Sequence, residues 1–170
     1  VDTGALAAMV DFQISGGIDG LVPCGTTGES ATLSHEEHSR VIELTIERAG
    51  GRVPVVAGTG SNSTSETLML TKSAERAGAN AALLITPYYN KPSQQGLYEH
   101  VLKISESVDL PLFLYNVPAR TSLNMTPETV ARLSELENIV GVKEATGDLS
   151  QVSDVIEYSV EDFIILSGDD

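Results

Sequence analysis

The chain has 170 residues, of which 41% are hydrophobic and 20% charged, a composition typical of one globular domain. Its formal net charge of −14, with only 10 Lys and Arg, argues against binding to nucleic acid or to an anionic membrane. No apolar run is long enough to span a bilayer, and no basic segment precedes an apolar stretch at the start, so we expect neither a membrane span nor a signal peptide.

Cys24 is the only cysteine, so an intrachain disulfide is impossible and a reducing compartment fits. We therefore expect a cytoplasmic protein. Because Cys24 follows the apolar run Leu21-Val-Pro, we expect a buried, unreactive thiol rather than a nucleophile.

Short apolar runs alternate along the chain with segments of helical period. After an opening helix around Ala5–Ser15, we expect buried parallel strands at Gly20–Cys24, Val53–Ala57, Ala81–Ile85, Leu112–Tyr115, Ile139–Val142 and Phe163–Leu166. The helices between them are expected to begin at the capping box Ser34-His-Glu-Glu37, to cover Glu66–Ala77 with Ser65 as cap and Gly78 at the end, to cover about Gln95–Ser107, to follow Thr126-Pro127, and to cover about Ser150–Tyr158.

The strand starts recur at intervals of roughly 24 to 33 residues, the length of one βα unit. A doubly wound sheet and a (β/α)₈ TIM barrel both fit this repeat. The Gly25-Thr-Thr-Gly-Glu29 turn lacks the glycine spacing of a doubly wound sheet, and polar loops after many strands favour the barrel. A complete barrel has eight units and usually about 250 residues. We therefore expect residues 1–170 to be a partial TIM-barrel domain that lacks the first strand and the C-terminal strand and helical region.

Three side chains near strand ends are candidates for chemistry. Lys143 directly follows the strand Ile139–Val142, at the end where a barrel holds its active site, and partial desolvation there frees an amine to attack a carbonyl. Tyr115 ends another strand, where a phenol can transfer protons, and Arg120 in the next loop suits a substrate carboxylate. Taken singly, each has an ordinary alternative: a lysine reaching out to water, a strand-end aromatic, and a surface ion pair.

The remaining candidates lie in loops and at a helix start. Thr26 and Thr27, between two glycines, can hold a small carboxylate or merely form a turn. Tyr88 and Tyr89 are typical of an interface. His35 and His38 lack the metalloprotease spacing and an evident third ligand, so we expect no metal site there.

Five segments resemble the dihydrodipicolinate synthase family in order and spacing: Gly25-Thr-Thr-Gly-Glu-Ser30, Pro87-Tyr-Tyr-Asn90, Tyr115-Asn-Val-Pro-Ala-Arg-Thr121, Gly141-Val-Lys-Glu-Ala-Thr-Gly147 and Ser167-Gly-Asp-Asp170. The resemblance implies a barrel lyase in which pyruvate forms a Schiff base with Lys143. The resulting enamine would attack L-aspartate 4-semialdehyde to give 4-hydroxy-tetrahydrodipicolinate, with no metal or organic cofactor.

The resemblance also assigns residue roles. Tyr115, Thr26 and Tyr89 match a proton relay to which a neighbouring subunit contributes the Tyr89 equivalent, and Thr27 matches the residue that holds the pyruvate carboxylate. Arg120 matches the arginine that binds the carboxylate of the semialdehyde, and the Gly168 carbonyl would line the pocket. A further set matches the site where sensitive members bind L-lysine as a feedback inhibitor: Ser30, Ala31, His35, His38, Asn62, Glu66 and Tyr88.

Two other functions stay open. One is a different pyruvate aldolase of the same superfamily that acts on a sugar acid, although such lyases typically lack arginine at the position of Arg120. The other is a catalytically dead binding paralogue, against which Lys143, Tyr115 and Arg120 argue. For the full-length protein the resemblance implies a homotetramer, a dimer of dimers. The 170-residue chain alone is expected to be poorly stable and inactive, because open sheet edges expose unpaired backbone groups.

Overall fold

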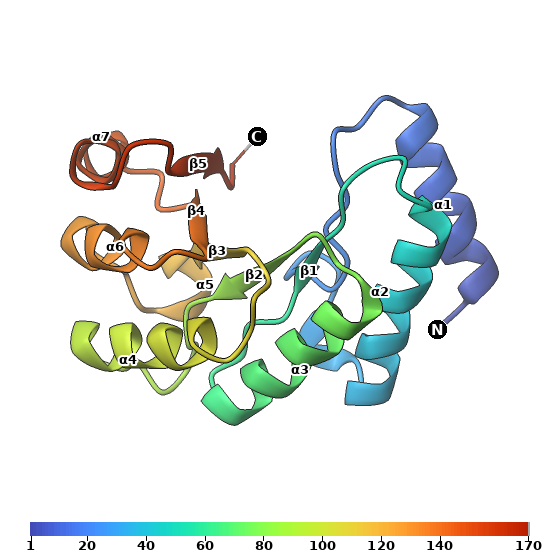
Figure 1. Ribbon diagram of the computed structural model, residues 1–170, viewed down its shortest axis with the longest axis horizontal. Helices are drawn as coiled ribbons and strands as arrows, with labels where there is room; N and C mark the ends of the chain where they lie inside the picture. The colour runs from blue at the N-terminus through green and yellow to red at the C-terminus, as the bar shows by residue number, and fades with distance from the viewer. Residues whose placement is uncertain (170) are drawn as a thin grey trace.

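The structure, a computed structural model that describes residues 1–169, is an arc of five parallel strands with helices along its outer side (Figure 1). The strands are β1 (Val56–Gly58), β2 (Ala81–Ile85), β3 (Leu112–Asn116), β4 (Ile139–Glu144) and β5 (Ile164–Ser167). They neighbour one another in chain order. A doubly wound sheet reverses its order at a switch point, whereas a barrel does not. The expected incomplete barrel is therefore the architecture observed.

The helices lie close to their expected places. They are α1 (Thr3–Ser15), α2 (His35–Ala49), α3 (Thr64–Ala77), α4 (Gln94–Ser105), α5 (Pro118–Thr121), α6 (Pro127–Ser134) and α7 (Leu149–Tyr158), with a 3₁₀ turn at Ser30–Thr32. The capping box at Ser34 is present, since its hydroxyl accepts from Glu37 N and the Glu37 carboxylate accepts from Ser34 N. The cap expected at Ser65 is wrong. Ser63 has the extended backbone of a cap and accepts from Glu66 N, whereas Ser65 is already helical.

The strand expected at Gly20–Cys24 is also wrong. This segment makes one isolated parallel bridge, Leu21 to Val55, and the strand expected at Val53–Ala57 is observed as β1, which begins at Val56 and ends one residue later than expected, at Gly58. Two prolines explain the difference, because Pro23 and Pro54 have no N–H to donate to a ladder. Cys24 then turns into the left-handed region, with φ of 56°, and ends the extended run.

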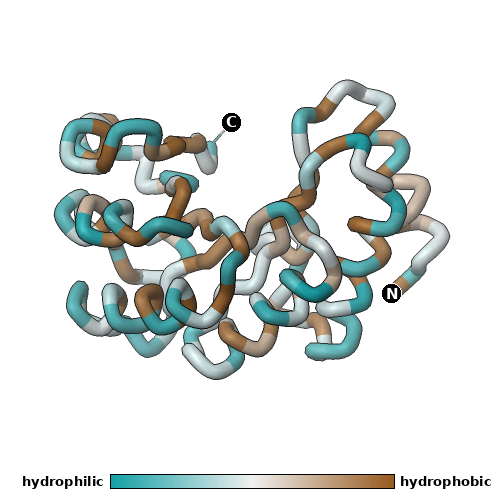
Figure 2. Tube along the Cα trace, viewed as in Figure 1, coloured by the Kyte–Doolittle hydropathy of each residue, from teal (hydrophilic) through white to brown (hydrophobic). Residues whose placement is uncertain are grey.

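Side chains alternate between two faces of the sheet, as the pleat requires. One face packs on the helices in the largest buried cluster, which includes Leu84, Leu112, Leu114 and Val142. The opposite, inner face carries a smaller cluster of Leu83, Tyr115 and Val117. Figure 2 shows hydrophobic residues along the strands and hydrophilic ones recurring along the outer helices. Asn116 and Glu144, which follow Tyr115 and Lys143 by one position, therefore face the helices and not the inner side.

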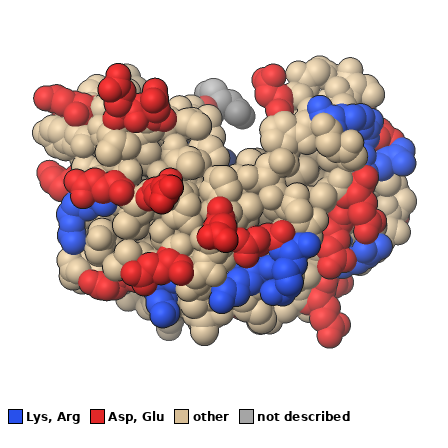
Figure 3. Space-filling view, viewed as in Figure 1, with Lys and Arg blue, Asp and Glu red and all other residues tan. Residues whose placement is uncertain are grey.

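Charged side chains are dispersed over the face of the molecule that Figure 3 shows. In Figure 3, acidic side chains recur across the helical face and basic ones form small separate groups. None of the helices within residues 1–169 has the length and apolar character needed to cross a membrane.

Candidate active site

Tyr115 and Lys143 lie side by side at the carboxyl end of the sheet. They are cross-strand partners in β3 and β4, and Lys143 Nζ lies 4.7 Å from the centre of the Tyr115 ring. Tyr115 is buried and Lys143 is half-buried. From the sequence we expected Lys143 to follow the strand directly, whereas in the structure it is part of β4. Its backbone is therefore fixed by pairing with both β3 and β5. The paired strands thus hold the amine of Lys143 beside the aromatic ring of Tyr115.

Gly168 borders the lysine from the end of β5. Its N–H donates to the Glu144 carbonyl at 2.8 Å. A Cβ at this position would lie 3.3 Å from Lys143 Cε and only 2.5 Å from Ala145 Cβ, so the close approach requires glycine. The segment Ser167-Gly-Asp-Asp170 ends at Asp170, which lies outside the described residues.

The threonine turn meets Tyr115 across a small void. Thr26 and Tyr115 both line this space of about 20 Å³. Thr27 is exposed and lines neither this void nor the larger cavity beside it. Tyr89 is 89% exposed and lines neither space. Among the hydrogen bonds of residues 1–169, none joins the hydroxyls of Thr26, Tyr89 and Tyr115. The structure therefore brings Thr26 and Tyr115 to one space and leaves Tyr89 exposed.

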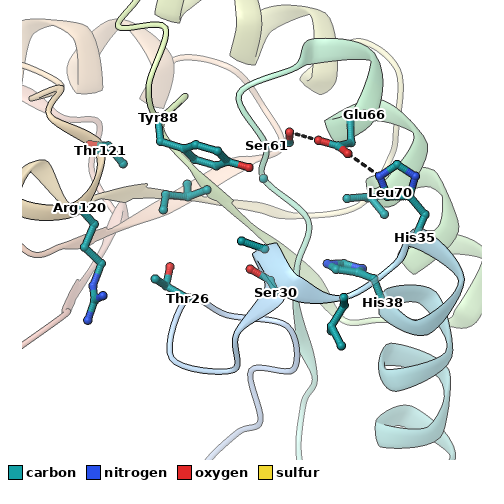
Figure 4. Close-up of a pocket in the computed structure, with 14 residues that line it drawn as sticks. Thr26, Ser30, His35, His38, Ser61, Glu66, Leu70, Tyr88, Arg120 and Thr121 are labelled. Carbon is teal, nitrogen blue, oxygen red and sulfur yellow. Dashed lines mark hydrogen bonds and ion pairs between the residues drawn. The ribbon is translucent and has the colours of Figure 1, made fainter. Parts of the chain in front are cut away.

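A larger cavity of about 260 Å³ adjoins the void (Figure 4). Thr26 and Arg120 lie on one side of it, with Arg120 carried by the short helix α5, and His35 and Glu66 lie on the other. Six of the seven residues matched to a lysine site line it: Ser30, Ala31, His35, His38, Glu66 and Tyr88. Asn62 does not line it, and its carbonyl accepts instead from Asn90 Nδ2 at 3.1 Å.

Glu66 is the anionic centre of this cavity. Its carboxylate accepts a hydrogen bond from the Ser61 hydroxyl and contacts His35 Nε2 (Figure 4). These two contacts, that with Ser61 first, hold the pKa of Glu66 below its ordinary value. Burial lowers the pKa of His38, whose Nδ1 has no hydrogen-bond partner. The cavity therefore combines a persistent negative charge with a neutral imidazole.

Cys24 is buried, as expected for an unreactive thiol. Its Sγ donates to the His38 carbonyl at 3.5 Å, and burial raises its pKa to about 12. A thiol that keeps its proton is a poor nucleophile. Within residues 1–169 no group of three or more His, Cys, Asp or Glu side chains could hold a metal ion.

Sequence reasoning missed several residues at these sites. Ser61 holds Glu66, and Thr121, Leu33 and Leu70 also line the larger cavity. Ser61 was the one with a usable signal, since it lies in a polar loop that follows a strand. The apolar lining residues look like ordinary core positions in the sequence.

Comparison with known proteins gives a consistent result. The model of the dihydrodipicolinate synthetase family matches residues 1–170. The 4-hydroxy-tetrahydrodipicolinate synthase of Syntrophus aciditrophicus (strain SB) is 58% identical over 170 residues, which is all of this chain and 58% of that protein. The chain thus spans little more than half the length of the curated relatives it matches.

Two crystal structures are similar in fold. One is the chloride-inhibited dihydrodipicolinate synthase of Acinetobacter baumannii in complex with pyruvate, with a TM-score of 0.97 and 50% identity over 99% of this chain and 58% of that chain. The other is the enzyme of Cyanidioschyzon merolae with lysine bound, with a TM-score of 0.96 and 41% identity over 99% and 58%.

Proposed function

The chain belongs to the dihydrodipicolinate synthetase family, and on this premise we propose that the protein it forms part of condenses pyruvate with L-aspartate 4-semialdehyde to give 4-hydroxy-tetrahydrodipicolinate. The observation that carries the proposal is the placement of Lys143 Nζ beside the Tyr115 ring at the carboxyl end of the strands. In a barrel, that end is where catalytic groups from different strands meet.

The proposed chemistry begins with attack of the Lys143 amine on the keto carbon of pyruvate. Loss of water gives an imine, and loss of a methyl proton gives an enamine whose carbon attacks the aldehyde of the second substrate. Tyr115 and Thr26, which share a void, are the proposed proton-transfer groups. Cyclisation of the amino group onto the imine carbon then releases the lysine. The imine itself serves as the electron sink, so the proposal needs no metal or organic cofactor.

Substrate recognition is assigned to three further residues. Thr27, in the turn after Cys24, is proposed to hold the pyruvate carboxylate, and the Gly168 carbonyl to line the pocket beside Lys143. Arg120 is proposed to bind the carboxylate of the semialdehyde through its planar fork. Its position at the cavity edge supports this role, and the relatives reported above are synthases and not sugar-acid lyases.

The proposal extends to assembly and compartment. Tyr89, exposed and held at a φ of 73°, is proposed to complete the proton relay of a neighbouring copy within a homotetramer, a dimer of dimers. A buried aromatic contact between copies would remove this large ring from water. The solitary cysteine fits the cytoplasm as the compartment.

We also propose L-lysine as an effector of the larger cavity. The carboxylate of Glu66 offers a partner for an ammonium group, and Ser30, His35, His38 and Tyr88 supply polar groups around it. Asn62 and Ala31 belong to the same proposed site, Asn62 through a change in its present contact with Asn90. The lysine-bound relative supports this assignment.

The decisive experiment traps the imine. The full-length protein is incubated with pyruvate and borohydride, and its mass is measured before and after proteolysis. We expect one reduced pyruvate on the peptide that carries Lys143, none in Lys143→Ala, and full labelling in the control Lys103→Ala, an exposed lysine on α4. A full-length protein that gains no adduct contradicts the proposal, and a substrate panel with other aldehydes tests the second substrate.

A further inference from the structure

Glu144 is a buried carboxylate without a cationic partner. Its side chain is 4% exposed, and the ion pairs found within residues 1–169 do not include it. Its oxygens instead accept from three neutral donors: Asn116 Nδ2, which contacts the two oxygens at 3.3 and 3.1 Å, Gln151 Nε2 at 3.2 Å and Thr146 N at 3.0 Å. Burying a charge costs free energy unless the charge is fully hydrogen-bonded. The Glu144 carboxylate therefore favours the one arrangement in which Asn116, Gln151 and Thr146 all donate to it.

The bond between Asn116 and Glu144 joins β3 to β4 one position beyond the candidate catalytic pair. Tyr115 pairs with Lys143, and Asn116 pairs with Glu144. Because successive side chains point to opposite faces, the first pair faces the inner side and the second faces the helices. Glu144 is therefore placed behind the lysine and does not reach the reacting atoms.

The register of these two strands needs such a restraint. The ladder between β3 and β4 is irregular at its start, where Leu112 pairs with Ile139 but Phe113 pairs with Gly141. A slip of one residue would separate Lys143 from Tyr115 and turn it to the other face. The pairing at the start of the ladder, at Leu112, therefore does not by itself determine which residue of β3 lies opposite Lys143.

The same network reaches the next helix and two loops. Gln151, on α7, donates to Glu144, to Asn124 Oδ1 at 3.2 Å and to the Met125 carbonyl at 3.3 Å. Asn116 also accepts from Met125 N at 3.0 Å. The carboxylate therefore ties β4 to β3 and to α7, and the side-chain amides of Asn116 and Gln151 extend the network to the loop before α6. Thr146 N lies on the loop that follows β4, so this loop is held as well.

We propose that Glu144 and Asn116 are positioning residues for the Schiff-base lysine: their buried hydrogen bond sets the register that places Lys143 against Tyr115. This inference rests on the proposed function, because it assigns the pair a task in forming the pyruvate adduct. Gln151 supports the same contact from α7. Loss of the carboxylate loosens the end of β4, and the amine then spends less time in its reactive position.

The test uses the full-length protein and measures the rate of borohydride-trapped adduct formation at saturating pyruvate, divided by the folded fraction. In Glu144→Gln, an amide N–H₂ faces the donors of Asn116 and Gln151, so at least two hydrogen bonds are lost. We expect a rate at least tenfold lower, a lower kcat, and an unchanged KM for the aldehyde. The control Glu157→Gln makes the same chemical change at an exposed site on α7 and should stay within twofold.

The normalisation separates positioning from stability alone. A merely structural role lowers the melting temperature but leaves the rate per folded molecule unchanged, and a rate within twofold of the unmodified protein overturns the inference. If Glu144→Gln does not fold, Gln151→Met removes one donor at similar volume. We then expect a loss of threefold or more, and a rate within twofold again overturns it. A parent protein that forms no adduct refutes the proposed function, whereas normal adduct formation in both variants refutes only the positioning role.

Discussion

The amine of Lys143 lies 4.7 Å from the centre of the Tyr115 ring, and the two residues are partners across neighbouring strands. An ammonium group over an aromatic face is attracted by the ring quadrupole. We therefore assign the ring and the hydroxyl of Tyr115 separate tasks: the ring packs against the lysine chain, and the hydroxyl is the proposed proton-transfer group of a residue that lines the small void together with Thr26.

Replacing Tyr115 by Phe separates these two tasks. The ring stays beside Lys143, so the pyruvate adduct should still form, but turnover should fall by about 10²- to 10⁴-fold because the proton-transfer group is missing. Trapping with borohydride measures the first step and steady-state kinetics measure the second. Equal turnover in Tyr115→Phe and the parent protein would show that the hydroxyl transfers no proton.

A methyl group at position 168 should displace the lysine. In Gly168→Ala the new Cβ would lie 2.5 Å from Ala145 Cβ and 3.3 Å from Lys143 Cε, so neighbouring atoms must shift. We expect at least a tenfold slower adduct step, since small misplacements at a reacting centre are costly. Gly96→Ala on α4 is the matched control, because its nearest atoms lie at 3.4 Å and the substitution should leave activity unchanged.

Arg120 should act on the second substrate only. Arg120→Ala should raise the KM for the aldehyde by roughly 10- to 100-fold, the range for a hydrogen bond to a charged group. Arg120→Lys should recover part of this loss, since it keeps the charge but not the fork. The rate of pyruvate trapping should not change in either variant. Slower trapping of pyruvate would show that Arg120 acts on pyruvate and would contradict its assignment to the aldehyde.

Lysine binding should depend on the charge of Glu66. In Glu66→Gln we expect at least a tenfold weaker affinity for L-lysine by calorimetric titration, with Glu157→Gln as the exposed control. The lowered pKa of Glu66 also has a consequence for stability: its contribution is present above its ordinary pKa of 4.5 and is lost as pH falls through its lower folded value. When the free energy of unfolding is measured as a function of pH, Glu66→Gln should therefore lack the part of the acid-induced loss that comes from protonation of Glu66.

The Cys24 thiol should be silent in the folded protein. Its pKa is raised from 9.0 to about 12, so at pH 9 only roughly one folded molecule in a thousand holds the thiolate. Alkylation followed by mass spectrometry should label Cys24 only after denaturant is added. Because the folded pKa exceeds the unfolded one, the associated stability is present below pH 9.0 and is lost as pH rises toward about 12. Rapid labelling of folded protein at pH 8 would contradict the burial of this side chain.

Much of the fold follows from local patterns. Apolar runs and helix caps separated by about one βα unit predicted the parallel order, and the helices at Ser34 and Pro127 begin where their caps indicate. The strand at Gly20–Cys24 failed because an apolar run carries no information about its hydrogen-bond partners, and Pro23 and Pro54 remove two donors. The cap of α3 is Ser63 and not Ser65, because the helix begins at Thr64, two residues earlier than expected.

The sequence by itself determined which residue types stand at the ends of which strands, because strand and helix periods are properties of neighbouring residues. Lys143, Tyr115 and Arg120 were identifiable in this way. Only the tertiary structure decided that Thr26 shares a void with Tyr115, that Thr27 and Asn62 line neither cavity, and that Glu144 is buried against Asn116. These contacts join segments far apart in the chain, and they exist only once the curvature and register of the sheet have brought those segments together.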